Sequence, residues 1–345
     1  MNAAVVTSLG KLEVLDLPMP KLGEYDVLCR LCYGSTCAGT DIHLMDGLHP
    51  YPIPFPTVLG HESVGRVVEV GSKVRNYKVG DLVSRVGYPV NPEIGLYSSW
   101  GGFAEYGVAR DHWQMRRDGC PEAEWTKYRV NQIIHPAIDE KFAPMIITWR
   151  ETLSYDRRLG VRPGSRVLLI GSGANALAHA ANCCNLGAEV TVVGSLKRQE
   201  SFEALPIRAY YNYREEGLAA RLLEERHGEF FDFLLDGVGA SDNVNALIPL
   251  LRQDGTLGVY GWNGRRSYAL NPFNAARSFR LYSDGYDEEE SNGEVQSLIL
   301  QGKLNAALWY DMENPVPLAQ IAGAYDSLRR HEALKYLIRL NPEQN

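Results

Sequence analysis

The chain has 345 residues, of which 45% are hydrophobic and 22% charged, and its formal net charge is −7 at pH 7. These values are typical of globular proteins, and the length suits two domains better than one hydrophobic core. An acidic chain is a poor general partner for nucleic-acid phosphates. The N-terminal stretch lacks the features of a signal peptide, and no apolar run reaches the roughly 18 residues that span a bilayer. We expect a soluble cytoplasmic protein without membrane or nucleic-acid partners.

The six cysteines are few for this length, and their spacing does not indicate a disulfide framework. Cys29 and Cys32 fall on a predicted strand, where residues three apart point to opposite faces. Cys183 and Cys184 are neighbours on a predicted helix, where they do not share a face. Both pairs are interpreted as packed thiols in a reducing compartment.

Residues 1 to about 110 form a succession of short β-like runs separated by Gly, Pro and Asp, among them AAVVTS, KLEVLDL, DVLCRLCY and FAEYGVA. This pattern predicts a small β-barrel. Residues 120 to 148 show no clean period, so mixed loop and helix is expected there.

From Arg166 onwards, apolar strands alternate with helices, as in RVLLIG, ALAHAANCCNLG, EVTVVG and FDFLLDGVG. This alternation predicts a parallel, doubly wound sheet, so the fold class is α/β. The segment NVNALIPLLRQDG is interpreted as a helix that precedes the strand TLGVYGW. After residue 292 helix-like segments resume, and KYLIRL is predicted to be a final strand.

A glycine-rich turn joins the first strand of this sheet to its helix, which is the context that a dinucleotide-binding fingerprint requires. The first glycine permits the tight turn, the second lets the backbone approach a pyrophosphate, and a small third residue allows close helix–strand packing. The helix N-terminus offers N–H groups to the phosphates. The predicted cofactor-binding residues of this turn are Gly171, Gly173, Ala174, Asn175 and Ala176.

The second strand of the sheet predicts which nucleotide is bound. NAD-binding proteins carry an acid near its end, whereas this chain has Gly194 there, followed by Ser195, Lys197 and Arg198. A small residue leaves room for a 2′-phosphate, which a hydroxyl and two cations can bind. We expect NADP, with NAD possible; the alternative is that both cations only solvate a surface turn.

The segment GHESVGRVVEVGSKVRNYKVGDLV, residues 60–83, places His61 and Glu62 directly before a glycine-punctuated strand. This segment closely resembles the medium-chain dehydrogenase/reductase family, and the resemblance extends over nearly the whole chain, best at 34–81 and 159–198. It implies a GroES-like β-barrel catalytic domain over 1–148, a Rossmann nucleotide-binding domain over 149–285, and a return segment, 286–345, that completes the catalytic domain. The structural zinc lobe of the family, four cysteines near 88–102, is missing from the sequence.

The resemblance also implies a catalytic zinc site. Thr40-Asp41-Ile42-His43 matches the family motif in which the Thr40 hydroxyl holds the substrate hydroxyl and His43 passes its proton to solvent. His61 would be a zinc ligand, with Glu62 beside it. The ligand cysteine of the family lies two positions before this threonine, whereas Cys37 lies one position earlier still, so Cys37 is either a ligand brought in by one extra loop residue or a buried thiol.

One further ligand of the family is not matched. An ungapped comparison places Ile147 and Thr148 at that position, and neither is a good zinc ligand. Glu151, one helical turn further on, is the candidate that remains besides Glu62. The alternative for Glu151 is a carboxylate at a helix start, where the helix dipole favours it.

The first functional interpretation is an NADP(H)-dependent dehydrogenase of an alcohol, polyol or sugar with one catalytic zinc per chain. The second is a zinc-free reductase of the same fold that acts on enones or carbonyls, and the third is a nucleotide-binding protein without catalysis. By resemblance, a homodimer or homotetramer is expected, paired through 256–262 and 279–284.

Overall fold

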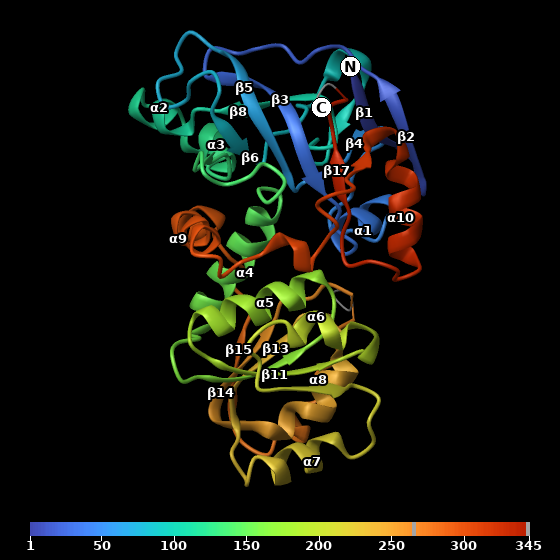
Figure 1. The fold of residues 1–345 in the computed structure, drawn as a ribbon, viewed down its shortest axis with the longest axis vertical. Helices are drawn as coiled ribbons and strands as arrows, with labels where there is room; N and C mark the ends of the chain where they lie inside the picture. Colours follow the sequence, from blue (N-terminus) through green and yellow to red (C-terminus); the bar gives the residue numbers. More distant parts are fainter. Residues whose placement is uncertain (264–266, 343–345) are drawn as a thin grey trace. The chain divides into compact units, whose positions relative to one another are not determined.

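The computed structural model describes residues 1–263 and 267–342 (Figure 1). The chain divides into two compact units. Unit 1 comprises Met1–Thr148 and Glu288–Asn345, and unit 2 comprises Trp149–Asp287. Helix α4 (Met145–Leu159) begins in unit 1 and continues into unit 2. The chain therefore leaves unit 1, forms unit 2, and returns.

Unit 1 is built on two antiparallel-rich sheets. The first runs in the order β2-β1-β4-β7, and the second in the order β16-β17-β3-β5-β6-β9 with β8 also paired to β3. The strands are β1 (Asn2–Ser8), β2 (Lys11–Asp16), β3 (Asp26–Ser35), β4 (Thr57–Val58), β5 (Ser63–Val70), β6 (Leu82–Ser84), β7 (Tyr97–Ser98), β8 (Tyr106–Arg110), β9 (Ile133–Ile134), β16 (Val316–Pro317) and β17 (Leu337–Arg339). The short runs of the sequence are thus strands of a small barrel.

Strand β3 is the centre of the second sheet, since it pairs with β5, β8 and β17. Both of its faces are covered, and Cys29 and Cys32 are buried thiols. The hydrophobic core of unit 1 combines residues of the first strands with Ile321, Tyr325 and Ile338 from the return segment. The return segment therefore completes the core of the barrel.

The helices of unit 1 are short except for α9. They are α1 (Thr40–Met45), α2 (His112–Arg117), α3 (Glu122–Trp125), α9 (Glu288–Leu300) and α10 (Ile321–Arg329), with 3₁₀ turns at Pro92–Ile94, Thr126–Tyr128, Ala306–Leu308 and Leu318–Gln320. The 120–148 segment is mixed, as the sequence predicts: it holds α3, a 3₁₀ turn and the short strand β9.

Unit 2 is a six-stranded parallel sheet in the order β12-β11-β10-β13-β14-β15. This is the doubly wound order, in which the chain winds outward in one direction and then in the other from β10. The strands are β10 (Arg166–Ile170), β11 (Glu189–Gly194), β12 (Ala209–Asn212), β13 (Phe231–Asp236), β14 (Leu251–Val259) and β15 (Phe279–Tyr282). The doubly wound sheet predicted from the sequence is confirmed.

Helices cover the two faces of this sheet. Helix α5 (Ala174–Asn185) contacts β10 and β11, and α6 (Gln199–Glu203) contacts β12. On the other face, α7 (Leu218–Glu225) and α8 (Ser241–Leu247) enclose a core with alternate residues of β10. The interpretation of 243–255 as one helix was wrong: α8 ends at Leu247, because a 3₁₀ turn containing Pro249 follows and β14 begins at Leu251.

Among the helices described, each is too short or too polar to cross a membrane.

Candidate functional site

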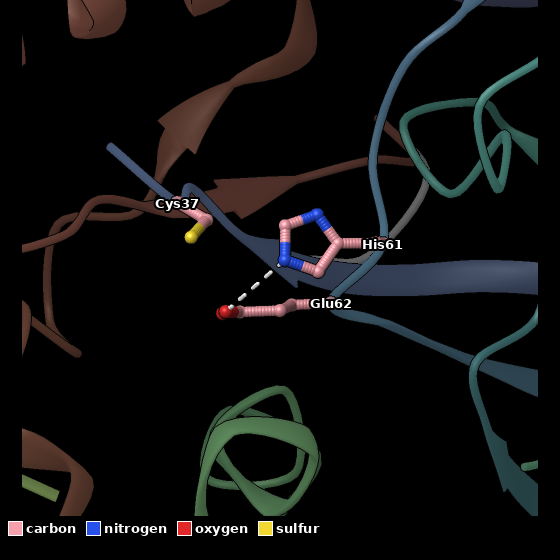
Figure 2. Close-up of side chains that lie close together, drawn as sticks. All are labelled: Cys37, His61 and Glu62. Atoms are coloured by element: carbon pink, nitrogen blue, oxygen red, sulfur yellow. Dashed lines mark ion pairs between the residues drawn. The ribbon is translucent and has the colours of Figure 1, made fainter. Parts of the chain in front are cut away.

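Three side chains that can bind a metal converge in unit 1 (Figure 2). Cys37 follows the end of β3, and His61 and Glu62 precede β5. The antiparallel register pairs Gly34 with Ser63, which brings the end of β3 beside the start of β5. The three ligand atoms lie within 4.8 Å of one another, and all three residues are buried. The dashed line in Figure 2 marks the ion pair between His61 Nε2 and Glu62 Oε1, which lie 3.6 Å apart.

The imidazole of His61 is held in one orientation. Its Nδ1 lies 3.0 Å from Oδ1 of Asp41, so Nε2 faces the cluster. The preceding Gly60 has φ +108°, and a Cβ there would clash with Phe103. Burial disfavours the imidazolium, but the Asp41 carboxylate and the Cys37 thiol together raise the pKa of His61 well above its usual value. A carboxylate behind a histidine is the arrangement that orients metal-binding histidines.

Asp41 is hydrogen-bonded to two residues of the cluster, His61 and Cys37. Its Oδ2 accepts hydrogen bonds from the backbone N–H of Cys37 at 2.9 Å and from the hydroxyl of Tyr325 at 2.5 Å. Burial and the adjacent Asp41 carboxylate raise the pKa of the Tyr325 phenol well above its usual value, so Tyr325 remains a donor. One carboxylate therefore fixes both Cys37 and His61.

The carboxylate of Glu62 is fixed by three neighbouring side chains. The Nζ of Lys335 lies 2.6 Å from each of its carboxylate oxygens. Thr148 Oγ1 donates to Oε1 at 2.8 Å, and the hydroxyl of Ser35 donates to Oε2. The carboxylate is thus neutralised and accepts hydrogen bonds on both oxygens.

Lys335 is a fully buried cation at the cluster. It is 1% exposed, and its Nζ also donates to the carbonyl of Thr36 at 3.1 Å. Burial disfavours the ammonium, but the charges of Glu62 and Cys37 raise the pKa of Lys335 above its usual value. A positive charge therefore stands beside the carboxylate that a cation would also use.

The donor set fits zinc. Thiolate, imidazole and carboxylate are the ligands that tetrahedral zinc takes in catalytic sites with three protein ligands, and at bond lengths of 2.0–2.3 Å such ligand atoms lie about 3.5 Å apart. His61 Nε2 and Glu62 Oε1, at 3.6 Å, are already at that spacing, Cys37 lies within 4.8 Å of both, and His61 is already oriented. Binding through Glu62 requires its carboxylate to turn away from Lys335 at least in part.

Glu151 belongs to unit 2, whereas Cys37, His61 and Glu62 belong to unit 1. Its carboxylate is buried and lies 3.3 Å from the hydroxyl of Tyr260. The alternative interpretation as a helix-start carboxylate was wrong, because α4 begins at Met145 and Glu151 falls in its second turn. The ligand role of Glu151 stays a prediction.

Thr40 and His43 lie on α1, which begins three residues after Cys37. Residues three apart share a face of a helix, and both side chains are half-buried. Burial lowers the pKa of His43 below 6.5, and the charge of Asp46 offsets part of that shift. His43 is therefore neutral over most of the physiological range and able to accept a proton.

The indole ring of Trp100 lies beside the imidazole of His61. Its ring centroid lies 5.4 Å from that of His61, and the residue is 46% exposed. Its φ of +65° is unfavourable for a bulky residue. The carbonyl of Trp100 packs so closely on Gly87 that no Cβ fits there, which holds the backbone in this conformation.

The glycine-rich turn of unit 2 has the conformation that the sequence predicts. Gly171 has φ +128°, and a Cβ there would lie 3.0 Å from Val238. Above Gly173 the space is open, since no described atom beyond its chain neighbours lies within 4 Å of the position of a Cβ. The helix α5 follows at once, starting at Ala174 and containing Asn175 and the buried Ala176. An open glycine at a helix N-terminus fits a pyrophosphate.

The end of β11 carries the residues predicted to choose the nucleotide. Gly194 is its last residue, and Ser195 directly precedes a 3₁₀ turn over Leu196–Arg198. Lys197 is exposed and Arg198 half-buried, and burial lowers the pKa of Arg198. The described chain thus places no carboxylate at the end of this strand.

Several residues of the metal-type cluster were not identified from the sequence: Ser35, Asp41, Tyr325 and Lys335. Asp41 had a local signal, since it stands inside the Thr40–His43 motif. Lys335 had none, because 273 residues separate it from Glu62.

Comparisons with known proteins agree with this arrangement. The profile of the alcohol dehydrogenase GroES-like domain matches residues 23–118. The L-threonine 3-dehydrogenase of Pectobacterium atrosepticum is 27% identical over 268 residues, which cover 72% of this chain and 69% of that protein. Among solved structures, 2R,3R-butanediol dehydrogenase from Bacillus subtilis aligns with a TM-score of 0.80 at 20% identity, over 99% of both chains. A putative zinc-binding dehydrogenase from Sinorhizobium meliloti 1021, bound to NADP, aligns with a TM-score of 0.79 at 19% identity, over 98% of both chains.

Proposed function

We infer that this chain is an oxidoreductase of the medium-chain dehydrogenase/reductase family, among the zinc-type alcohol and polyol dehydrogenases. From this premise we propose that it transfers hydride between NADP(H) and the carbinol carbon of an alcohol, polyol or sugar. The observation that carries the proposal is the buried cluster of Cys37, His61 and Glu62, placed next to the helix that bears Thr40 and His43. The cluster supplies the metal ligands and the helix supplies a path for the proton.

We propose Cys37, His61 and Glu62 as the residues that hold a zinc ion. When bound, zinc supplies Lewis acidity to the substrate oxygen. Asp41 keeps Nε2 of His61 facing the ligand position and fixes the backbone of Cys37. Lys335 keeps Glu62 in place as a carboxylate. Asp41 therefore reduces the reorganisation that zinc binding would cost, whereas the Glu62 carboxylate has to turn partly away from Lys335 to bind the ion.

The proton of the substrate hydroxyl leaves through α1. Thr40 is proposed to accept it on Oγ1 while donating its own proton onward, and His43, on the same face, is the acceptor that exchanges with solvent. The lowered pKa of His43 supports this role, because a neutral imidazole is needed to receive the proton. The exposed indole of Trp100 is proposed to bound the substrate beside His61.

NADP(H) is proposed as the nucleotide. The open space over Gly173 at the start of α5 accommodates the pyrophosphate. Ser195, Lys197 and Arg198 offer a hydroxyl and two cations to a 2′-phosphate, and Gly194 brings no carboxylate that would repel it.

A second candidate function is supported by Glu62. Its bonds to Lys335, Thr148 and Ser35 satisfy the carboxylate without any metal, and Thr148 is not a zinc ligand. A zinc-free reductase of the same fold would use this arrangement as it stands, with the nicotinamide delivering hydride to an enone or carbonyl.

Metal content separates the two candidates. We expect the purified protein to bind one zinc per chain, measured by elemental analysis after dialysis against a low concentration of chelator. Cys37→Ser removes the thiolate ligand, so its zinc content is expected to fall at least tenfold, roughly 1.4 kcal/mol or more in binding free energy. The matched control is Cys32→Ser, which replaces another buried thiol outside the cluster and should keep its zinc.

A protein that holds no zinc in either form and still oxidises NADPH with a carbonyl substrate would overturn the first candidate in favour of the second. Retention of full zinc by Cys37→Ser would show that Cys37 is only a packed thiol.

We also propose that copies of the chain pair through β15. This strand is the last in the order of the sheet in unit 2, and Leu281 on it is 56% exposed.

A further inference from the structure

The side chain of Tyr210 lies over the end of β11. Tyr210 stands on β12 in register with Val192, two residues before Gly194, so its ring shares a face with the position of a residue-194 side chain. A Cβ on Gly194 would lie 2.8 Å from Cβ of Ser172, 3.0 Å from Cζ of Tyr210, and closer still to the Tyr210 hydroxyl. Glycine is therefore the residue that this environment accepts at position 194.

The hydroxyl of Tyr210 also holds the turn that follows. It donates to the carbonyl of Ser195 at 2.7 Å, the same carbonyl that accepts from the backbone N–H of Arg198 at 2.9 Å. The ring packs on Phe202 of α6, with centroids 5.5 Å apart, so it is not free to swing away. Burial raises the pKa of Tyr210 to about 12, so the phenol remains a donor.

We infer that Tyr210 is a specificity-determining residue of the nucleotide site: it occupies the place of the carboxylate that would bind an adenine ribose, and it positions Ser195 and Arg198 for a nucleotide that carries a 2′-phosphate. This inference rests on the proposed preference for NADP(H) and deepens it. It assigns the preference to a side chain on the third strand, outside the β11 turn.

The position of Tyr210 predicts how a substitution of Gly194 will affect nucleotide binding. Installing an acid at position 194 should not by itself create an NADH site, because Tyr210 already fills the space that the new side chain needs. The acid should become effective only when Tyr210 is truncated. Positions 194 and 210 are therefore expected to be strongly coupled.

The test compares four proteins: the unmodified chain, Gly194→Asp, Tyr210→Ala and the double variant. Dissociation constants for NADPH and NADH are measured separately by fluorescence titration. We expect Gly194→Asp to weaken NADPH without improving NADH, and the double variant to bind NADH about tenfold more tightly than Gly194→Asp does, the value of one charge-assisted hydrogen bond. Equal NADH affinity in Gly194→Asp and the double variant would overturn the inference.

Two further measurements guard against a simple folding defect. Tyr210→Phe keeps the ring on Phe202 and loses only the hydrogen bond to Ser195, so we expect weaker NADPH binding by about threefold, unchanged NADH binding and an unchanged thermal midpoint. Gly194→Ala should lower the thermal midpoint more in the presence of Tyr210 than in the Tyr210→Ala background, where only the close contact with Ser172 remains. If Gly194→Ala is harmless in both backgrounds, the close contact does not exist and the inference fails.

Failure of the proposed function is visible on its own. If the unmodified chain binds NADH more tightly than NADPH, the preference for NADP(H) is wrong, whereas the coupling between positions 194 and 210 is still measured by the thermal midpoints.

Discussion

The glycine-rich turn of unit 2 and the metal-type cluster of unit 1 are built in opposite ways. The turn is made of backbone and empty space within six consecutive residues: Gly171 permits its conformation, and Gly173 leaves room above the helix N-terminus. The cluster is made of buried charges from segments far apart in the chain, with Lys335 joined to Glu62 across 273 residues. One site depends on the absence of side chains, and the other on side chains that neutralise one another.

The difference decides how each site responds to substitution. In the cluster, removing one charge leaves its partner buried and uncompensated, so the fold itself suffers. At Gly173 in the turn, an added atom would obstruct a ligand and leave the packing intact. The following substitutions test this contrast, beginning with the largest expected effect.

Lys335→Met is expected to destabilise the metal-free protein by about 3–5 kcal/mol, because it leaves the Glu62 carboxylate buried without its cation. The measurement is the free energy of unfolding from denaturant titration after chelator treatment. Zinc should restore part of the loss, since a bound metal replaces the missing positive charge.

The control for this variant is the double substitution Lys335→Met with Glu62→Gln, which removes both charges and should recover most of the stability. If Lys335→Met alone is as stable as the unmodified chain, the ion pair of Lys335 and Glu62 does not contribute to the free energy of unfolding. The contrast with the turn would then be wrong.

Gly173→Ala is expected to weaken NADPH binding by about a hundredfold, or ~2.7 kcal/mol, because its methyl group enters the open space proposed for the pyrophosphate. The thermal midpoint of the free protein should not fall. Gly293→Ala is the matched control, since that glycine also has open space around its Cβ position and belongs to α9 in unit 1. Equal loss of NADPH binding in both variants would contradict the proposed pyrophosphate position.

His43→Gln is expected to have the smallest effect, a decrease in kcat of roughly tenfold, below the range for a group that accepts the substrate proton directly. Burial lowers the pKa of His43, so its neutral form persists to below pH 6.5, and the acidic limb of the kcat profile should lie below that value. In the unmodified chain kcat should decrease as the pH falls through this pKa, because His43 becomes protonated. The variant should not show this decrease. A profile unchanged by the substitution would remove His43 from the proton path.

The same contrast explains what could be predicted from the sequence. The alternation after Arg166 and the run from Gly171 to Ala176 predict the sheet and its turn, since both arise from local periodicity and from backbone freedom. The resemblance at 60–83 correctly predicted the barrel, and it identified His61 and Glu62 as candidate site residues. Cys37, one position out of register in the sequence, lies in the cluster with them.

What the sequence did not predict comes from tertiary contacts. Lys335 and Tyr325 carry no local pattern that marks them as site residues, because their role arises only when the return segment packs on the barrel. Tyr210 was missed for a similar reason: its effect on Gly194 depends on the register between two strands.

The pair of Glu62 and Lys335 also has a consequence for how the protein folds. Closing a contact over 273 residues requires the ordering of a long intervening chain, and such non-local contacts form late. During synthesis the ribosome releases Cys37, His61 and Glu62 long before Lys335, so these residues wait without the cation that neutralises the carboxylate. The unit 2 sheet, whose strands and helices are contiguous between Trp149 and Asp287, can fold in that interval. The cluster is therefore completed late in the synthesis and folding of the protein, when the return segment packs on the barrel.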